Sequence, residues 1–284
     1  MIGVFDSGYG GLTILKQLRE TLPEYDFMYL GDNARAPYGP RSFDVVYEFT
    51  RQAVMKLFSL GCHLVILACN TASAKALRTI QQEDLKRECN LPSGTGTTTL
   101  EEQGYRVLGV IRPTVEIIGN LTKTRHIGIV ATEGTIRSES YELEIGKLYP
   151  DITVTGQACP LWAAIVEAGE ADSLGAEYFV KKRINQLLTK DPMIDTIILG
   201  CTHYPLLLNA LNKAVPKDIK LVSQGEYVAE SLKDYLRRHP EMDKHCSKGG
   251  TIQYYTTESE ERFKEIGTNF LHKDIIVNHI NLQS

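Results

Sequence analysis

Two cysteines stand in matched surroundings, and together they could remove a proton from one carbon atom and return another. Cys69 follows the apolar run LVILA and precedes Asn-Thr, while Cys201 follows TIILG and precedes Thr-His. A thiolate can take a proton from a carbon acid, and a thiol on the opposite face can return one, which inverts a stereocentre. The reverse reaction exchanges these roles, so it needs two groups of similar intrinsic pKa, and two cysteines meet that requirement.

Each cysteine is predicted to lie where a buried strand ends and a helix begins. The runs 64–68 and 196–200 are short, apolar and partly β-branched, which favours buried strands. Residues 72–87 contain few helix breakers and Thr71 is a suitable N-cap, while Pro205 fits a first helical position. Backbone N–H groups and the positive end of the helix dipole meet at such junctions, and they stabilise a thiolate.

Strands and helices alternate along the chain, which predicts a parallel, doubly wound α/β fold. IGVFDSGYGG resembles IGIVATEGTI, and LVILACNTAS resembles TIILGCTHYP, so we expect two similar α/β halves. Ligands of such sheets bind beyond the carboxyl ends of the strands, which places the site in a crevice between the halves. One wall is predicted to carry Asp6, Ser7, Cys69, Asn70 and Thr71, and the other Thr132, Thr135, Cys201, Thr202 and His203.

Residues that could assist proton transfer are expected beside both thiols. His203 could exchange a proton with Cys201, and Asp6 follows a strand that could neighbour Cys69. Because a carboxylate beside a thiol disfavours the thiolate, we interpret Asp6 as an orienting or proton-relay group, and Glu167 is a candidate for that part near the other thiol. Hydroxyls, amides and backbone N–H groups at the helix starts favour a small, negatively charged amino acid as the substrate.

The composition argues against several classes of function. The net charge is −4 with no basic block, and no apolar run is as long as a membrane span, so neither a nucleic-acid nor a membrane partner is expected. The start MIGVFDSG lacks the features of a signal peptide, and the six cysteines form no CxxC pair, so reduced thiols are expected. No lysine stands out as a pyridoxal phosphate partner and no metal-ligand set is visible, which favours catalysis without a cofactor or a metal.

Six motifs make the chain resemble the bacterial glutamate racemases of the aspartate/glutamate racemase superfamily. They occur in order and span most of the sequence, which makes the resemblance specific. The motifs are FDSGYGGL (5–12), GDNARAPYG (31–39), ACNTAS (68–73), ATEGT (131–135), CPL with VEAG (159–169) and GCTHYP (200–205).

The resemblance implies roles for individual residues. Cys69 is implied to act on D-glutamate and Cys201 on L-glutamate, with Asp6, His203 and Glu167 assisting them. The positions that match substrate contacts are Ser7, Pro37, Tyr38, Gly39, Asn70, Thr71, Thr132, Thr135 and Thr202.

The resemblance also implies how the chain is organised. One domain comprises about residues 1–111 plus 213–284 and the other about 112–212, with the active site in the cleft between them. No cofactor, a cytoplasmic location and supply of D-glutamate for peptidoglycan are implied, and a homodimer stays open. Two departures concern the hinge rather than the catalytic motifs: the polar loop 90–104 is longer than usual, and Arg112-Pro113 stands where Glu-Pro is frequent.

Three alternatives remain. The nearest is a racemase for aspartate or another acidic amino acid, although His203 favours glutamate because aspartate-type relatives tend to carry an acidic residue there. A non-catalytic binding protein that keeps the fold is disfavoured by the presence of both thiols. A redox protein pairing Cys69 with Cys201 in a disulfide would show oxidation-reversible function and no inversion of amino acids.

Overall fold

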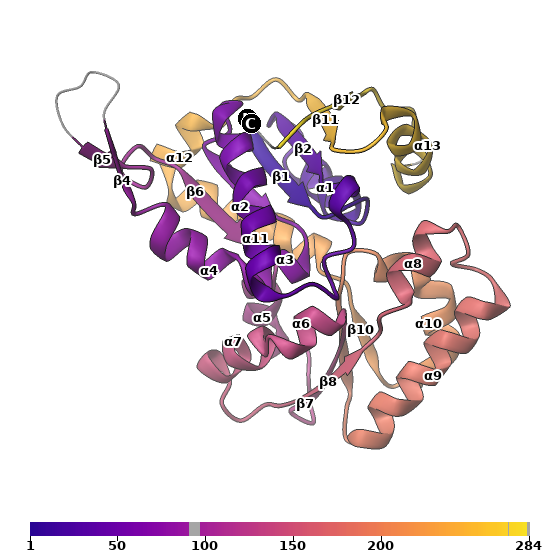
Figure 1. Ribbon diagram of the computed structural model, residues 1–284. Helices are drawn as coiled ribbons and strands as arrows, with labels where there is room; N and C mark the ends of the chain where they lie inside the picture. Colours follow the sequence, from indigo (N-terminus) through magenta and orange to yellow (C-terminus); the bar gives the residue numbers. More distant parts are fainter. Residues whose placement is uncertain (91–96, 272, 283–284) are drawn as a thin grey trace.

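Two parallel sheets form two lobes that face each other (Figure 1). The structure, a computed structural model, describes residues 1–90, 97–271 and 273–282. We call the six-stranded sheet with its helices the first lobe, and the four-stranded sheet with its helices the second lobe. An antiparallel pair, β4 (Glu88–Asn90) and β5 (Thr97–Thr99), projects from the first lobe.

The first lobe is built on a parallel sheet ordered β12-β11-β2-β1-β3-β6. All residues of β1, β2 and β3 are buried, because helices cover both faces of the sheet, and this explains why these strands are continuous apolar runs. The strands are β1 (Ile2–Asp6), β2 (Phe27–Gly31), β3 (Leu64–Leu67), β6 (Arg106–Gly109), β11 (Ile252–Thr256) and β12 (Val277–His279).

Two hydrophobic cores cover the two faces of this sheet. Val4 packs into the core that contains α1 and α11, whereas the next residue, Phe5, packs into the core that contains α2. Ser42 caps α2 by accepting a hydrogen bond from the backbone of Val45. The helical segments are α1 (Leu12–Thr21), η1 (Asn33–Arg35), α2 (Phe43–Ser59), α3 (Asn70–Lys75), α4 (Leu77–Thr79), the π-helical η2 (Ile80–Asp84), α11 (Gly225–Arg238), α12 (Pro240–His245) and α13 (Glu260–Leu271).

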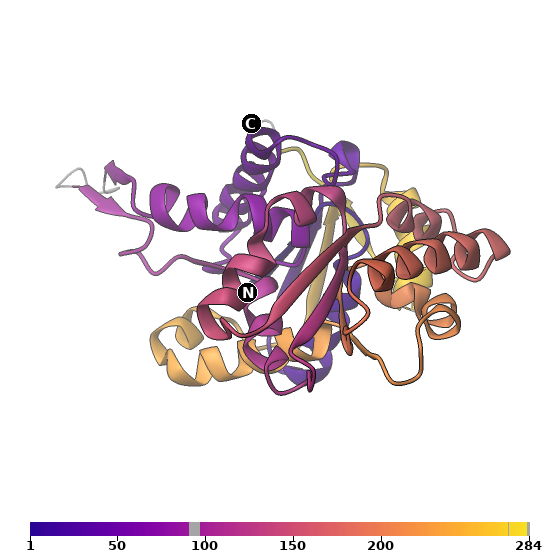
Figure 2. The same ribbon diagram turned by 90° about the horizontal axis from the view of Figure 1, so that it is seen from below.

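The second lobe repeats this plan on a parallel sheet ordered β10-β9-β7-β8. One face packs against α5 and α7 and the other against α8, α9 and α10, and Figure 2 shows helices on both sides of these strands. The elements are α5 (Ile111–Ile118), β7 (His126–Ala131), α6 (Glu133–Arg137), α7 (Ser140–Leu148), β8 (Thr153–Ala158), α8 (Trp162–Glu167), α9 (Leu174–Lys190), β9 (Thr196–Gly200), η3 (Tyr204–Leu207), α10 (Leu208–Ala214) and β10 (Lys220–Val222).

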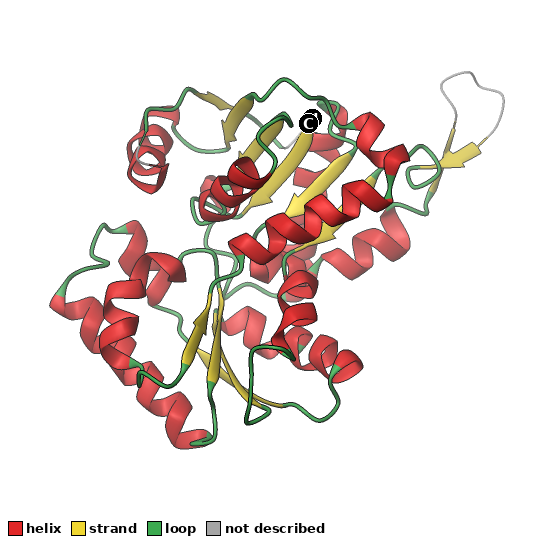
Figure 3. Cartoon of the chain, turned by 180° about the vertical axis from the view of Figure 1, so that it is seen from behind, coloured by secondary structure: helices red, strands yellow, loops and turns green. Residues whose placement is uncertain are grey.

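The chain passes between the lobes twice, first from β6 into α5 and then from β10 into α11, and Figure 3 shows the two sheets as separate groups of strands. The expected doubly wound α/β fold with two parallel sheets is confirmed. The predicted return to the first domain at residue 213 is too early, however. β10 pairs in register with β9, so residues 220–222 belong to the second lobe.

Other predictions also need correction. The expected helix over residues 72–87 is divided into α3, α4 and η2, and α3 already begins at Asn70. Cys69 has an extended backbone and occupies the N-cap, so Thr71 lies inside the helix instead of capping it. Within the predicted loop 90–104, the β-branched residues 97–99 form β5, and residues 91–96 lie outside the described residues. In the described part of the chain, no helix is both long and apolar enough to cross a lipid bilayer.

Candidate active site

Both cysteines follow a central strand of their sheet. Cys69 comes two residues after β3 and caps α3, and Cys201 comes directly after β9 and leads into η3, which contains Pro205. Their residues are only 6% and 7% exposed. The charge of Cys201 adds a small share to the raised pKa of Cys69, so the two cysteines interact electrostatically across the lobes.

The first-lobe cysteine is surrounded by residues at the carboxyl end of β1. Its Sγ lies 3.4 Å from Ser7 Oγ, and the buried Asp6 accepts a hydrogen bond of 2.9 Å from the backbone of Gly8. Burial raises the pKa of Cys69 to about 12, and the charge of Asp6 adds to this effect. Hydrogen bonds from Ser7 and from the start of α3 lower the pKa of Cys69, but by less than burial raises it. Cys69 is therefore a neutral thiol at neutral pH, because burial outweighs the helix start that was expected to stabilise a thiolate.

The second-lobe cysteine heads a relay of three side chains. Cys201 Sγ lies 3.7 Å from Nδ1 of His203, and Nε2 of the same ring lies 2.8 Å from Oε1 of Glu167. Burial works against a charged imidazole, but the hydrogen bonds to Cys201 and Glu167 outweigh it and raise the pKa of His203 to about 10. His203 is therefore protonated at neutral pH and can donate to the sulfur of Cys201. The structure thus brings His203 into contact with this cysteine, and Glu167 is connected to the cysteine through His203.

The two lobes touch directly between the cysteines. Thr202 Oγ1 donates to Oδ2 of Asp6 at 3.4 Å, and the hydroxyl of Thr13 donates to the backbone oxygen of Thr202 at 3.0 Å. Gly10 lies so close to the second lobe that a Cβ on it would be 2.2 Å from Thr202 Oγ1 and 2.5 Å from Nδ1 of His203. Burial raises the pKa of Asp6, although the positive charge of His203 opposes the shift. Asp6 thus lies between the two lobes, where it can contact groups from both.

Three threonine hydroxyls form a cluster that spans the lobes. Thr71 Oγ1 lies 2.9 Å from Thr132 Oγ1 and 3.3 Å from Thr135 Oγ1, and the last two are 3.0 Å apart. Thr132 caps α6 by accepting a hydrogen bond from the backbone of Thr135. Gly39 is adjacent, because a Cβ on it would lie 3.0 Å from the Cβ of Thr132. These hydroxyls can donate to the carboxylate of a small ligand.

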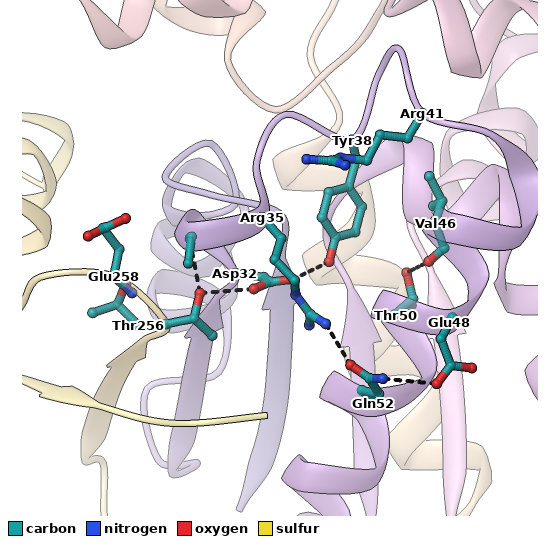
Figure 4. A network of polar contacts seen from close by, with 12 residues as sticks. Asp32, Arg35, Tyr38, Arg41, Val46, Glu48, Thr50, Gln52, Thr256 and Glu258 are labelled. Carbon is teal, nitrogen blue, oxygen red and sulfur yellow. Dashed lines mark hydrogen bonds and ion pairs between the residues drawn. The ribbon is translucent and has the colours of Figure 1, made fainter. Parts of the chain in front are cut away.

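The hydroxyl of the predicted contact residue Tyr38 points to Asp32 (Figure 4). The hydroxyl donates to the buried carboxylate of Asp32, which also accepts a hydrogen bond of 2.7 Å from Arg35 Nε. Burial and the charge of Asp32 raise the pKa of Tyr38 well above its usual range. Tyr38 therefore anchors the loop that carries Gly39, while its exposed neighbour Pro37 lies at the surface.

Asn70 has two partners that the sequence analysis missed. Its side-chain amide donates to Gln224 Oε1 and accepts from the hydroxyl of Tyr141, both at 2.7 Å. Gln224 stands between β10 and α11, and Tyr141 lies in α7, for which the sequence analysis predicted no element. The helical spacing of apolar residues in the stretch YELEIGKLY was the only available signal, and it indicates a helix, not a contact with Asn70.

Metal-ligating side chains do not gather in the described residues: no group of three or more His, Cys, Asp or Glu there could hold a metal ion. Catalysis without a cofactor stays a prediction.

The family model, the similar sequences and the similar structures that match this chain are all named as racemases. A sequence model of the family described as Asp/Glu/Hydantoin racemase matches residues 10–232. The chain is 40% identical to a glutamate racemase from Ruegeria sp. (strain TM1040), over 96% of this chain and 97% of that protein. Its fold matches a glutamate racemase isoform from Bacillus anthracis with a TM-score of 0.85 at 33% identity, over 99% and 97% of the two chains. It also matches the Francisella tularensis glutamate racemase in complex with D-glutamate, with a TM-score of 0.84 at 31% identity over the same shares.

Proposed function

This chain belongs to the Asp/Glu/Hydantoin racemase family and is therefore an amino-acid racemase, and we propose that it interconverts L- and D-glutamate with Cys69 and Cys201 as its two acid–base groups. Glutamate is supported by relatives of nearly full length that are named for that activity. The observation that carries the two-thiol mechanism is that each lobe supplies one buried cysteine at the end of a central strand, with its own polar partners.

The mechanism follows from the different surroundings of the two sulfurs. Starting from L-glutamate, the thiolate of Cys201 takes the Cα proton and the thiol of Cys69 gives a proton to the opposite face of the carbanion. The positive His203 stabilises the negative sulfur, and Glu167 holds the imidazole in place. The neutral state of Cys69 suits its role as proton donor in this direction. In the reverse direction, the ammonium group of the substrate favours the thiolate of Cys69.

Substrate recognition is assigned to the polar groups around this pair. We place one carboxylate of glutamate at the hydroxyls of Thr71, Thr132 and Thr135, and we assign contacts with its other polar groups to Ser7, Pro37, Gly39, Asn70 and Thr202. We keep Tyr38 among the proposed substrate contacts, with its hydroxyl held by Asp32.

The decisive experiment is circular dichroism of the purified protein with L-glutamate, L-aspartate and buffer alone. The signal of L-glutamate should decay to zero, and in deuterated water each inverted molecule should gain one deuterium at Cα. L-Aspartate should keep its signal. Decay with L-aspartate but not with L-glutamate would select the alternative substrate, and no decay with either would leave the binding and disulfide alternatives.

The cellular role is part of this proposal: we place the protein in the cytoplasm, where it supplies D-glutamate for peptidoglycan. Cys62, Cys69, Cys159, Cys201 and Cys246 are free and buried, which fits a reducing compartment. Deleting the gene should make growth depend on added D-glutamate. Light scattering would show whether the active form is a homodimer.

Glu167→Gln should lower the pKa of His203 from about 10 towards its ordinary value of about 6.5, because a neutral amide supports an imidazolium less than a carboxylate does. NMR titration of the imidazole measures this pKa. Protonated His203 contributes stability that is fully present below about pH 6.5 and is lost as the pH rises through about 10. The free energy of unfolding of the unmodified protein should therefore exceed that of Glu167→Gln at pH 6, and the difference should shrink towards pH 10.

The matched control for this prediction is Glu170→Gln, which removes an exposed carboxylate three residues away. It should leave the titration of His203 unchanged. An unchanged pKa of His203 in Glu167→Gln would show that this carboxylate does not support the imidazolium.

A further inference from the structure

Gln224 is buried where both connections between the lobes pass close to the first-lobe cysteine, and we propose that it is a positioning residue that fixes the side-chain amide of Asn70. This inference rests on the proposed function, because Asn70 follows Cys69 and is assigned to the substrate there. Gln224 itself belongs to no sequence motif that indicated chemistry.

The hydrogen bonds among three side chains close into a ring. Asn70 Nδ2 donates to Gln224 Oε1 at 2.7 Å, and Gln224 Nε2 donates to the hydroxyl oxygen of Tyr141 at 2.7 Å. The hydroxyl of Tyr141 then donates to Oδ1 of Asn70, also at 2.7 Å. Each member of the ring gives one hydrogen bond and receives one. All three side chains come from different elements: α3, α7 and the segment before α11.

The ring permits one orientation of the Asn70 amide. If this amide were turned over, its Oδ1 would face Gln224 Oε1, and two acceptors would meet without a hydrogen between them. Gln224 cannot turn over to relieve this, because its Nε2 also donates to Thr114 Oγ1 at 3.0 Å and lies 3.3 Å from the backbone oxygen of Val110. The second hydrogen of Asn70 Nδ2 therefore has a fixed direction, and it is the one that can serve a ligand.

Burial makes this orientation costly to lose. Asn70, Gln224 and Tyr141 are 2%, 3% and 1% exposed, so water does not replace a broken hydrogen bond among them. An unsatisfied buried donor or acceptor costs more than an average hydrogen bond contributes. The ring is therefore a rigid support for the residue next to Cys69.

The position of Gln224 also connects the ring to the passage between the lobes. Val110 and Thr114 lie at the first crossing, from β6 into α5, and Gln224 lies at the second, from β10 into α11. Tyr141 belongs to the second lobe and Asn70 to the first. A relative movement of the lobes has to deform this ring. The orientation of the Asn70 amide therefore depends on the relative orientation of the two lobes.

The test compares Gln224→Leu, which removes the hydrogen bonds at similar volume, with the unmodified protein. We expect kcat/KM for glutamate to fall about tenfold, the equivalent of one to two lost hydrogen bonds. In the Asn70→Ala background the same substitution should change kcat/KM by less than about twofold, because no amide is left to position. Tyr141→Phe removes the third member of the ring and should behave like Gln224→Leu in both backgrounds, which keeps the test valid if Gln224→Leu does not fold.

The matched control is Gln81→Leu. The amide of Gln81 donates to the backbone oxygen of Val107 at 2.7 Å, in the first lobe. The substitution should lower the melting temperature without the tenfold loss of kcat/KM. An equal loss for Gln224→Leu with and without the Asn70 side chain would overturn the positioning role and indicate a general structural effect.

An additional readout does not depend on activity. In ¹⁵N NMR spectra, the side-chain amide of Asn70 should exchange its hydrogens slowly with water in the unmodified protein and quickly in Gln224→Leu. If the unmodified protein did not racemise glutamate, the proposed function would fail while this exchange experiment still tested the ring. Equal exchange in both proteins would refute the inference even in an active racemase.

Discussion

Cys69→Ser and Cys201→Ser should each lower the rate of glutamate racemisation about a thousandfold, while the protein stays folded. General acid–base groups contribute between about a hundredfold and ten-thousandfold, and a serine hydroxyl is a far weaker acid than a thiol, so either variant should exchange protons at Cα only slowly at neutral pH. The buried sites accept serine with little change of volume. Initial rates from both enantiomers, followed by circular dichroism, measure the effect.

The values of kcat/KM for the L-to-D and D-to-L reactions are linked by the equilibrium constant. L- and D-Glutamate have equal free energies in water, so kcat/KM must fall by the same factor from either side, and differences between the two thiols can appear only in kcat and KM separately. Cys246→Ala is the matched control, because Cys246 is a buried thiol near α12 and away from both active-site sulfurs. It should retain the full rate. Retention of the full rate in either serine variant would remove that thiol from the mechanism.

Gly10→Ala should lower kcat/KM about a hundredfold, because the new methyl group would lie 2.2 Å from Thr202 Oγ1 and 2.5 Å from Nδ1 of His203. Relieving this contact requires the loop after β1 or the imidazole to move, and a displacement of about 1 Å in an active site can cost about a hundredfold in rate. The substitution acts from the first lobe on the relay of the second. Kinetics together with the NMR titration of His203 would show both consequences.

Gly146→Ala is the matched control for this substitution. Gly146 lies in α7, and a Cβ on it would meet no atom within 4 Å. Alanine in a helix interior should stabilise the protein by about 0.5–1 kcal/mol without changing the rate. A Gly10→Ala variant with the full rate and an unchanged titration of His203 would mean that the lobes separate easily at this contact.

The sequence predicted the parts of the site that depend on local order. The apolar runs before Cys69 and Cys201 are buried strands, and the polar residues after them meet at the carboxyl ends of their sheets. This was predictable because a buried strand followed by a helix start is encoded within about ten residues. His203 and its cysteine are two residues apart, so their contact could be inferred from the sequence alone.

Contacts between distant segments could not be predicted in the same way. Gln224 is separated from Asn70 by 154 positions, and nothing near either residue indicates the other. The hydroxyl of Tyr38 donates to the carboxylate of Asp32, a contact that the motif resemblance did not predict. β10 is only three residues long, and its assignment to the second lobe depends on pairing with β9 rather than on its own sequence.

The strand order of the first lobe has a consequence for synthesis on the ribosome. β2 pairs with β11, although residues 27–31 and 252–256 lie at opposite ends of the chain. All four strands of the other sheet, residues 126–222, are translated before β11 emerges. Until then one edge of β2 has no strand beside it, and unpaired apolar edges promote aggregation. The nascent chain therefore leaves this edge of β2 unpaired until residue 256 has been translated.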